Sequence, residues 1–183
     1  MNGVTRLMLT GIYGVSNVNN STVVIDREGH YVITANYVTQ YLVFIYPWWV
    51  KAYIYINGTR AQVFTGWMGW FDNGAQIVVF PQVIEVHPGI IYNITKTYTY
   101  IVNGSMNIDV PYVEEYYVKL NLKSLPAIIN GTNSTLVSGY YPEGTRIEIP
   151  EYYYLNNTSR LAISASPREF VVSSPVNVQA SET

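Results

Sequence analysis

One eight-residue stretch, Asn36-Tyr37-Val38-Thr39-Gln40-Tyr41-Leu42-Val43, occurs twice in the chain. It returns as Pro111-Tyr112-Val113-Glu114-Glu115-Tyr116-Tyr117-Val118, with Tyr, Val, Tyr and Val at matching places. Further matches follow each copy in the same order: Ile56-Asn57-Gly58-Thr59 with Ile129-Asn130-Gly131-Thr132, and Phe71-Asp72-Asn73-Gly74 with Tyr141-Pro142-Glu143-Gly144. Because the order is kept, the matches predict a duplicated domain whose second copy has shorter loops.

The repeat predicts three parts: residues 1–35 as a partial repeat, residues 36–110 as a first domain and residues 111–183 as a second. The segment from Asn2 to Thr10 is similar to the segment from Asn156 to Ser164, so the chain is expected to begin inside a repeat. The same alignment sets Asn93-Ile94-Thr95-Lys96 against Asn157-Thr158-Ser159-Arg160. The strands of residues 1–35 are expected either to fold onto the first domain or to add to the open edge of a neighbouring copy.

Alternation of apolar and polar residues predicts strands throughout, and no segment keeps a helical period. Ala52–Ile56 alternates aliphatic residues with tyrosines, and Val118, Leu120 and Leu122 alternate with Lys119 and Asn121. Two β-branched runs, Thr22–Ile25 and Tyr31–Thr34, flank a turn-forming segment and predict a hairpin. The fold is therefore expected to be all-β, with two tandem small β-sandwich domains, Ig-like or open-barrel, and extra N-terminal strands.

The composition excludes several classes of protein. Charged residues make up 12% of the 183 residues and the net charge is -2, without a block of either sign. The chain therefore has no electrostatic signature of nucleic-acid binding or of an anionic membrane surface. It has no cysteine, so it has no disulfides. Its longest apolar run, Tyr41–Val50, is too short for a membrane span.

Sequons for N-glycosylation are more frequent than chance allows. Nine of the 16 asparagines begin Asn-x-Ser/Thr, whereas roughly two or three would be expected at this content of Asn, Ser and Thr. This excess favours an extracellular glycoprotein; the alternative is that Asn-Gly-Thr simply makes good turns. The candidate acceptors are Asn19, Asn20, Asn57, Asn93, Asn103, Asn130, Asn133, Asn156 and Asn157.

Residues that could carry catalysis are few. None of the three aspartates begins the Asp-Thr/Ser-Gly turn of an aspartic protease, and only two histidines are present. Glu114 and Glu115 are adjacent, but neighbours on a strand point to opposite faces and cannot share a proton. We expect no enzymatic activity, no catalytic residue, no metal site and no cofactor.

The four tryptophans all lie in the first copy of the repeat, at Trp48, Trp49, Trp67 and Trp70. Flat aromatic side chains on loops can stack on sugar rings or on a neighbouring subunit. They can also fill a core or the joint between repeats. All three interpretations stay open from the sequence.

Several of these stretches resemble the tandem β repeats of secreted prokaryotic surface proteins. The resemblance rests on Arg6-Leu7-Met8-Leu9-Thr10-Gly11, Val32–Tyr37, Thr39–Val43 and Tyr141–Ile147. The sequons, tyrosines and low charge are similar to the versions found in thermoacidophilic archaea, on S-layer-associated stalk proteins, surface filaments and secreted acid proteases. The segment Trp67-Met68-Gly69-Trp70 departs from this pattern.

The resemblance implies a non-catalytic, glycosylated structural protein of an archaeal cell surface, such as an S-layer stalk or a filament subunit. Its partners would be other copies of itself, other surface-layer proteins, or glycans. Two alternatives are an accessory carbohydrate-binding module of a secreted hydrolase and a virion surface protein.

Overall fold

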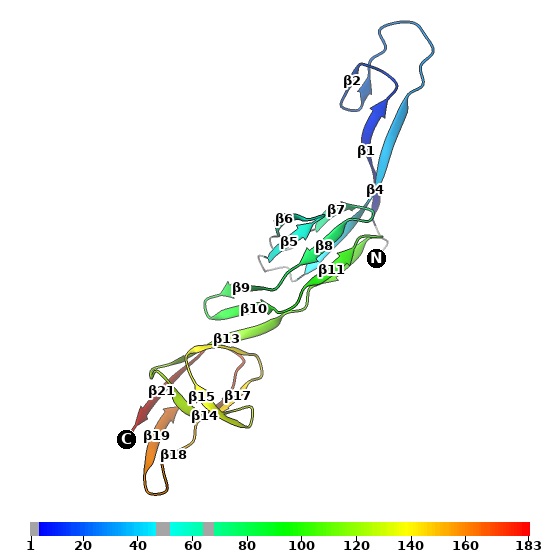
Figure 1. Cartoon of the computed structure of the whole chain (residues 1–183). Helices are drawn as coiled ribbons and strands as arrows, with labels where there is room; N and C mark the ends of the chain where they lie inside the picture. Colours follow the sequence, from blue (N-terminus) through cyan, green and yellow to red (C-terminus); the bar gives the residue numbers. More distant parts are fainter. Residues whose placement is uncertain (1–3, 47–51, 64–67) are drawn as a thin grey trace. The chain divides into compact units, whose positions relative to one another are not determined.

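A computed structural model describes residues 4–46, 52–63 and 68–183, with the side chains of Gln62 and Val63 outside the description. The fold is all-β, as the sequence predicts, and the described residues contain no helix. Contacts divide the chain into two compact units. Figure 1 labels most of their strands. Unit 1 comprises Met1–Val79 with Thr97–Val110, and unit 2 comprises Phe80–Lys96 with Pro111–Thr183.

These units differ from the expected domains in one segment. Phe80–Lys96 contacts unit 2, although it lies within the expected first domain of residues 36–110. The reason is a strand pair: β10 (Ile90–Ile94) is hydrogen-bonded to β9 (Gln82–His87) on one side and to β13 (Val113–Leu120) on the other. Residues 4–35 belong to unit 1, because β1 (Thr5–Tyr13) pairs with β4 (Thr34–Tyr46).

Unit 1 has two four-stranded sheets. In the first, β4 pairs antiparallel with β1 and with β7 (Met68–Asp72), and parallel with β12 (Met106–Asp109). The second has the order β11 (Tyr98–Ile101), β8 (Gln76–Val79), β5 (Ala52–Ile56) and β6 (Thr59–Val63). A short hairpin of β2 (Val18–Asn19) and β3 (Thr22–Val23) follows β1.

Unit 2 has one seven-stranded and one four-stranded sheet. The seven-stranded sheet contains β9, β10, β13, β16 (Gly139–Pro142), β18 (Tyr152–Tyr154), β19 (Arg160–Ser166) and β21 (Val176–Glu182). The four-stranded sheet has the order β15 (Thr132–Leu136), β14 (Leu125–Ile129), β17 (Arg146–Glu148) and β20 (Glu169–Val171). As in unit 1, the long strand that opens the repeat is central: β13 pairs antiparallel with β16 and parallel with β21.

The two units therefore share one pairing scheme. Seven strands of unit 1 pair with one another in the same way as seven strands of unit 2. In chain order, the strands of unit 1 are β4, β5, β6, β7, β8, β11 and β12, and their counterparts in unit 2 are β13, β14, β15, β16, β17, β20 and β21. The registers agree as well: Val43 lies beside Met106, and its repeat counterpart Val118 lies beside Val176. The strands that the sequence repeat aligns therefore occupy the same positions in the two pairing schemes.

The core of unit 2 lies between its two sheets. Val118, Leu120 and Val178 come from the seven-stranded sheet, and Leu125 and Ile147 come from the four-stranded sheet; all are buried in one cluster. In unit 1 the same layers contribute Val43 and Ile108 on one side and Ile54, Ile77 and Val79 on the other. The alternation that predicts these strands therefore identifies their buried faces, as a sandwich requires.

Two expectations from the sequence are wrong in detail. Thr22–Ile25 and Tyr31–Thr34 do not form a hairpin with each other: β3 covers only Thr22–Val23 and pairs with β2, and Thr34 opens β4. The β-branched residues of both runs favour strands, but β4 pairs with the longer apolar strand β1 instead.

The sequence alignment of Asn93–Lys96 with Asn157–Arg160 also differs from the structural correspondence between the two units. Asn93 lies opposite Val113, and the matching exchange of backbone hydrogen bonds in unit 2 joins Ala162 to Thr183. Ala162, rather than Asn157, is therefore the structural counterpart of Asn93. The loop after β18 carries the sequons that produced the displaced match.

Candidate functional site

Of the four tryptophans, only Trp70 lies in the described part of the chain. It sits on β7, is half-buried, and has the Arg6 guanidinium carbon 4.5 Å from the centre of its ring. This is a cation–π contact between two strands of unit 1. The predicted partner-contact or glycan-contact residues Trp48, Trp49 and Trp67 lie outside the described residues.

A chain of polar contacts accompanies Trp70. Arg6 Nε donates to Gln40 Oε1 at 2.8 Å, and Gln40 Nε2 donates to Asp72 Oδ1 at 2.7 Å. The side chain of Gln40 is buried, so both ends of its amide have a partner where water cannot replace one. The contacts join β1, β4 and β7 and hold β1 in register on the sheet.

Eight of the nine predicted glycosylation acceptors are exposed, and the exception is Asn93. Asn93 is half-buried in β10, and its Nδ2, the atom that would carry a glycan, donates to Glu115 Oε1 at 2.9 Å. Asn156 shows the opposite arrangement. Its Oδ1 accepts from both the backbone N and the Oγ1 of Thr158, at 2.9 Å each, which leaves Nδ2 directed away from these contacts in an exposed loop.

Asn57 and Asn130 also have a structural role that accounts for their presence. Each begins a two-residue hairpin turn with positive φ, 48° and 49°, followed by a glycine with φ of 82° or 78°. This is the backbone of a type I′ turn, for which Asn-Gly is the favoured pair. The turn explanation is thus sufficient in itself for these two sequons.

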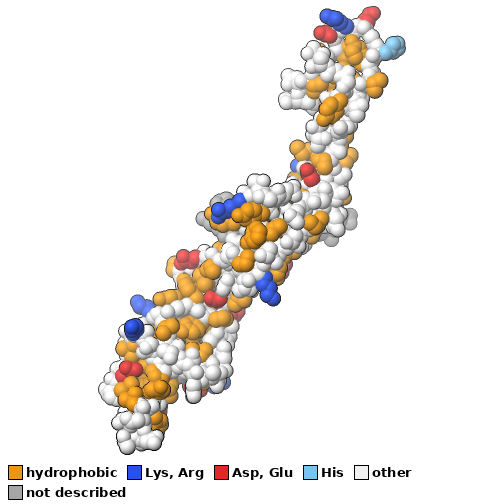
Figure 2. Space-filling model, viewed as in Figure 1, with side chains coloured by type: hydrophobic (Ala, Val, Ile, Leu, Met, Phe, Trp, Pro, Cys, Tyr) orange, Lys and Arg blue, Asp and Glu red, His pale blue; other side chains and the backbone are white. Residues whose placement is uncertain are grey.

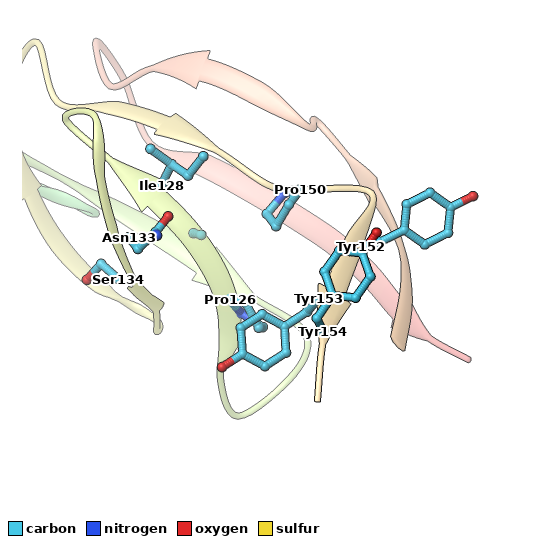
Figure 3. A pocket seen from close by; sticks show the side chains of 9 residues that line it. Pro126, Ile128, Asn133, Ser134, Pro150, Tyr152, Tyr153 and Tyr154 are labelled. Atoms are coloured by element: carbon cyan, nitrogen blue, oxygen red, sulfur yellow. The ribbon is translucent and has the colours of Figure 1, made fainter. Parts of the chain in front are cut away.

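A groove lined by tyrosines lies beside β18 in unit 2. It has a volume of about 380 Å³ and opens to solvent, with β18 on one side and β14 and β15 on the other (Figure 3). The exposed fractions of Tyr152, Tyr153 and Tyr154 are 42%, 47% and 67%. The lining residues are Pro126, Ala127, Ile128, Asn133, Ser134, Pro150 and the three tyrosines.

Sequence reasoning did not single out this groove, although the run Tyr152-Tyr153-Tyr154 was visible in the sequence. Consecutive aromatic residues on a strand point to both faces, so at least part of the run must meet solvent or a partner. Tyr152 also has the guanidinium carbon of Arg160 on β19 4.0 Å from its ring centre. The groove therefore offers flat aromatic surface, and Arg160 stacks on one of its tyrosines.

The adjacent carboxylates Glu114 and Glu115 have separate partners, in agreement with their expected opposite directions. Glu114 Oε1 accepts from the Tyr116 hydroxyl at 2.8 Å, and Glu115 Oε1 accepts from Asn93. The hydrogen bond to Glu114, together with burial and the negative charge, raises the pKa of Tyr116 to about 12. Burial also raises the pKa of Tyr100 in unit 1, helped by Tyr98 and Asp109.

The described residues contain no cluster of three or more His, Cys, Asp or Glu side chains that could hold a metal ion. Among the same residues, no helix has the length and apolarity that a membrane crossing needs. Charged side chains are few and scattered on the visible face in Figure 2. What the surface offers instead is tyrosine, amide and hydroxyl groups, together with open strand edges.

No protein-family model matches the chain, and no match exists among curated proteins or solved structures.

Proposed function

We propose that this chain is a non-catalytic, glycosylated structural protein of a cell surface, acting as a stalk or filament subunit of the archaeal type that the sequence resembles. The observation that carries the proposal is the way one repeat is joined to the next. The hairpin β9–β10, which follows β8 in the chain, pairs with β13, the first strand of the next repeat. The first repeat thus supplies two strands to a sheet of the second, a connection that suits a linear array.

The surface supports an extracellular setting. A protein with 12% charged residues has little charge repulsion to keep it in solution. Exposed sequons would supply bulky, neutral, hydrated groups in place of charge. Eight exposed acceptors spread over both units are suited to that purpose.

The test is localisation together with assembly. We expect the protein to be recovered from the envelope or secreted fraction of its native host, with a mass above that of the bare polypeptide. Electron microscopy of this material is expected to show regular filaments or projections. A bare-mass protein in the cytosolic fraction, sedimenting as a monomer at all concentrations, would exclude the proposal.

The tyrosine groove favours a second candidate function, carbohydrate binding as an accessory module. Tyrosine rings stack on the apolar faces of sugar rings, and Asn133 and Ser134 supply hydrogen-bonding groups within the same groove. Titration with soluble oligosaccharides, followed by tyrosine fluorescence, tests this function. Saturable binding that is lost in Tyr153→Ser and retained in Tyr140→Ser, an exposed tyrosine outside the groove, would favour the binding module.

A further inference from the structure

One predicted glycosylation acceptor differs from the others because it lines the tyrosine groove of unit 2. Asn133 begins the sequon Asn133-Ser134-Thr135 and is exposed on β15. It lies on the side of the groove that faces the tyrosines of β18 (Figure 3). Among the nine acceptors, all of them described, Asn133 alone lines this groove. A sugar attached to Asn133 therefore begins at the wall of the groove.

Strand pairing fixes the place where this sugar begins. Asn133 lies opposite Ile128 in the antiparallel ladder of β14 and β15. Leu125 and Ala127 are buried, so the alternating side chains of Pro126 and Ile128 point away from the core. Residues directly opposite each other share a face, so the side chain of Asn133 lies on the same outward face as Ile128. Its amide is thus held beside apolar surface that belongs to the groove.

The groove has the size and the chemistry of a site for a small neutral ligand. Its volume of about 380 Å³ falls in the range of about 300–1,000 Å³ that is typical of ligand pockets. The tyrosines of β18 keep much of their surface exposed, and such rings offer an apolar face together with a hydroxyl group. No described residue that lines the groove carries a charge. A neutral glycan therefore finds stacking surface and hydrogen-bonding groups in it.

Attachment to Asn133 makes a weak affinity sufficient. A ligand that is joined to its site by a short flexible link has an effective concentration in the millimolar range. A contact with a dissociation constant of about 1 mM, which is weak for a free sugar, then fills the groove about half of the time. The groove thus needs no tight recognition of sugars to be occupied in a glycosylated chain.

We infer that the glycan attached to Asn133 folds back onto the chain and packs in the tyrosine groove. The inference rests on the proposed function as a glycosylated protein and names what fills the groove. The first sugar lies over Ile128 and Pro126, and the following sugars reach the rings of β18. This glycan joins β15 and β18, which belong to the two different sheets of unit 2. An oligosaccharide from outside then enters the groove only where Asn133 carries no sugar.

Two substitutions of one residue separate the glycan from the groove. Thr135 completes the sequon of Asn133 but does not line the groove. Thr135→Ala removes the sequon, whereas Thr135→Ser keeps it, and both leave every lining side chain unchanged. Both variants and the unmodified chain are purified from the glycosylating host, and circular dichroism checks their fold. We expect glycopeptide mass spectrometry to find a glycan on Asn133 in the unmodified chain and in Thr135→Ser, and none in Thr135→Ala.

Hydroxyl-radical footprinting then reports whether the rings are covered. Oxidation of Tyr153 and Tyr154 should rise at least about twofold in Thr135→Ala, because a tethered ligand at an effective concentration equal to its dissociation constant covers the rings about half of the time. Thr135→Ser should match the unmodified chain. Tyr140, which is exposed outside the groove, should react equally in all three proteins.

NMR of the unmodified glycoprotein gives a measurement that needs no variant. We expect nuclear Overhauser contacts between sugar protons and the ring protons of Tyr153 or Tyr154. If Thr135→Ala does not fold, the presence or absence of these contacts decides the question.

The outcomes separate this inference from the proposed function. If Asn133 carries a glycan but the oxidation of the two rings is unchanged in Thr135→Ala, the inference is wrong while the proposed function stands. The same holds if Asn133 is bare and other acceptors are occupied. It also holds if a soluble oligosaccharide binds the unmodified glycoprotein as tightly as it binds Thr135→Ala, since the groove is then open to outside ligands. A bare polypeptide mass in protein from the native host overturns both.

Discussion

Asn57 and Asn130 perform the same task at the same place in their two units. Asn57 Oδ1 accepts a hydrogen bond from the backbone N–H of Gln76, and Asn130 Oδ1 accepts one from that of Arg146, at 2.8 and 2.9 Å. In each case the turn of one hairpin is tied to the strand that lies next to it, β8 or β17. The shared geometry links a sequence motif to a tertiary contact, and its energetic importance can be measured.

Replacing Asn130 with alanine should destabilise the protein by about 2 kcal/mol. The change removes one hydrogen bond and places a residue that disfavours positive φ in the turn. Asn130→Asp keeps an acceptor oxygen and removes the sequon, so it should cost much less. Asn133→Ala, at an exposed position on β15, should change the free energy of unfolding by less than about 0.5 kcal/mol. Urea unfolding of the four proteins checks this order, and equal losses for Asn130→Ala and Asn133→Ala would contradict it.

The Gln40 side chain is expected to control how firmly β1 is held. Gln40→Leu removes its hydrogen bonds to Arg6 and Asp72 within a buried site. We expect a loss of about 1–3 kcal/mol, with faster hydrogen exchange concentrated in the amides of β1. Gln40→Glu retains an acceptor for Arg6 but sets a second carboxylate against that of Asp72, so it should also destabilise the protein. Unchanged exchange in β1 in both variants would show that the network does not anchor the strand.

The hydroxyl of Tyr116 should titrate above the ordinary range of a tyrosine. Its hydrogen bond to the Glu114 carboxylate raises its pKa to about 12, above the ordinary value of about 10. Because the folded-state pKa is raised, the stability gained from this bond is complete below about pH 10 and is lost as the pH rises from about 10 to about 12. Glu114→Gln should move the pKa of Tyr116 down. NMR titration with labelled tyrosine measures the pKa of Tyr116 in both proteins, and a value of about 10 in the unmodified chain would refute the assignment.

Glycan occupancy should differ between Asn156 and Asn93 in protein from a glycosylating host. Asn156 lies in an exposed loop with its Oδ1 held by Thr158, whereas Asn93 is half-buried and its Nδ2 donates to Glu115. Glycopeptide mass spectrometry should find Asn156 modified and Asn93 bare. Thr158→Ala removes the sequon at Asn156 and serves as the control for that site. Full modification of Asn93 would show that acceptors are used before β10 pairs with β13.

Much of the fold could be predicted from local patterns because the strands are strongly amphipathic. Ile54 is buried between the exposed or half-buried Tyr53 and Tyr55, and Ile147 is buried between the exposed Arg146 and Glu148, as alternation requires. Turn residues predicted where some strands end, since Asn57-Gly58 and Asn130-Gly131 adopt the turn type that Asn-Gly favours. The recurrence of such segments in the same order also indicated that the two halves share a plan.

Features that depend on pairing across long sequence distances could not be predicted in this way. Nothing in the local sequence of Ile90–Ile94 says that its partner is β13 rather than a strand of the first unit. The tyrosine groove likewise exists only because β14, β15 and β18 come together, and its residues lie in three separate segments. The role of Trp70 could not be predicted either, because its ring stacks with Arg6, which is far from it in the chain.

The parallel pairing of β4 with β12, and of β13 with β21, has a mechanical consequence. These are the strands by which the chain enters and leaves the repeated part of each unit, and in a parallel pair the entering end and the leaving end lie at opposite ends of the ladder. A pulling force along the chain therefore loads both parallel ladders in shear. One ladder includes the pair Val118 and Val176, and the other includes Val43 and Met106. The hydrogen bonds of each ladder then resist the force together and do not open one at a time. Each unit is thus built to bear tension, and rupture should require a higher force in this direction than peeling β1 from β4.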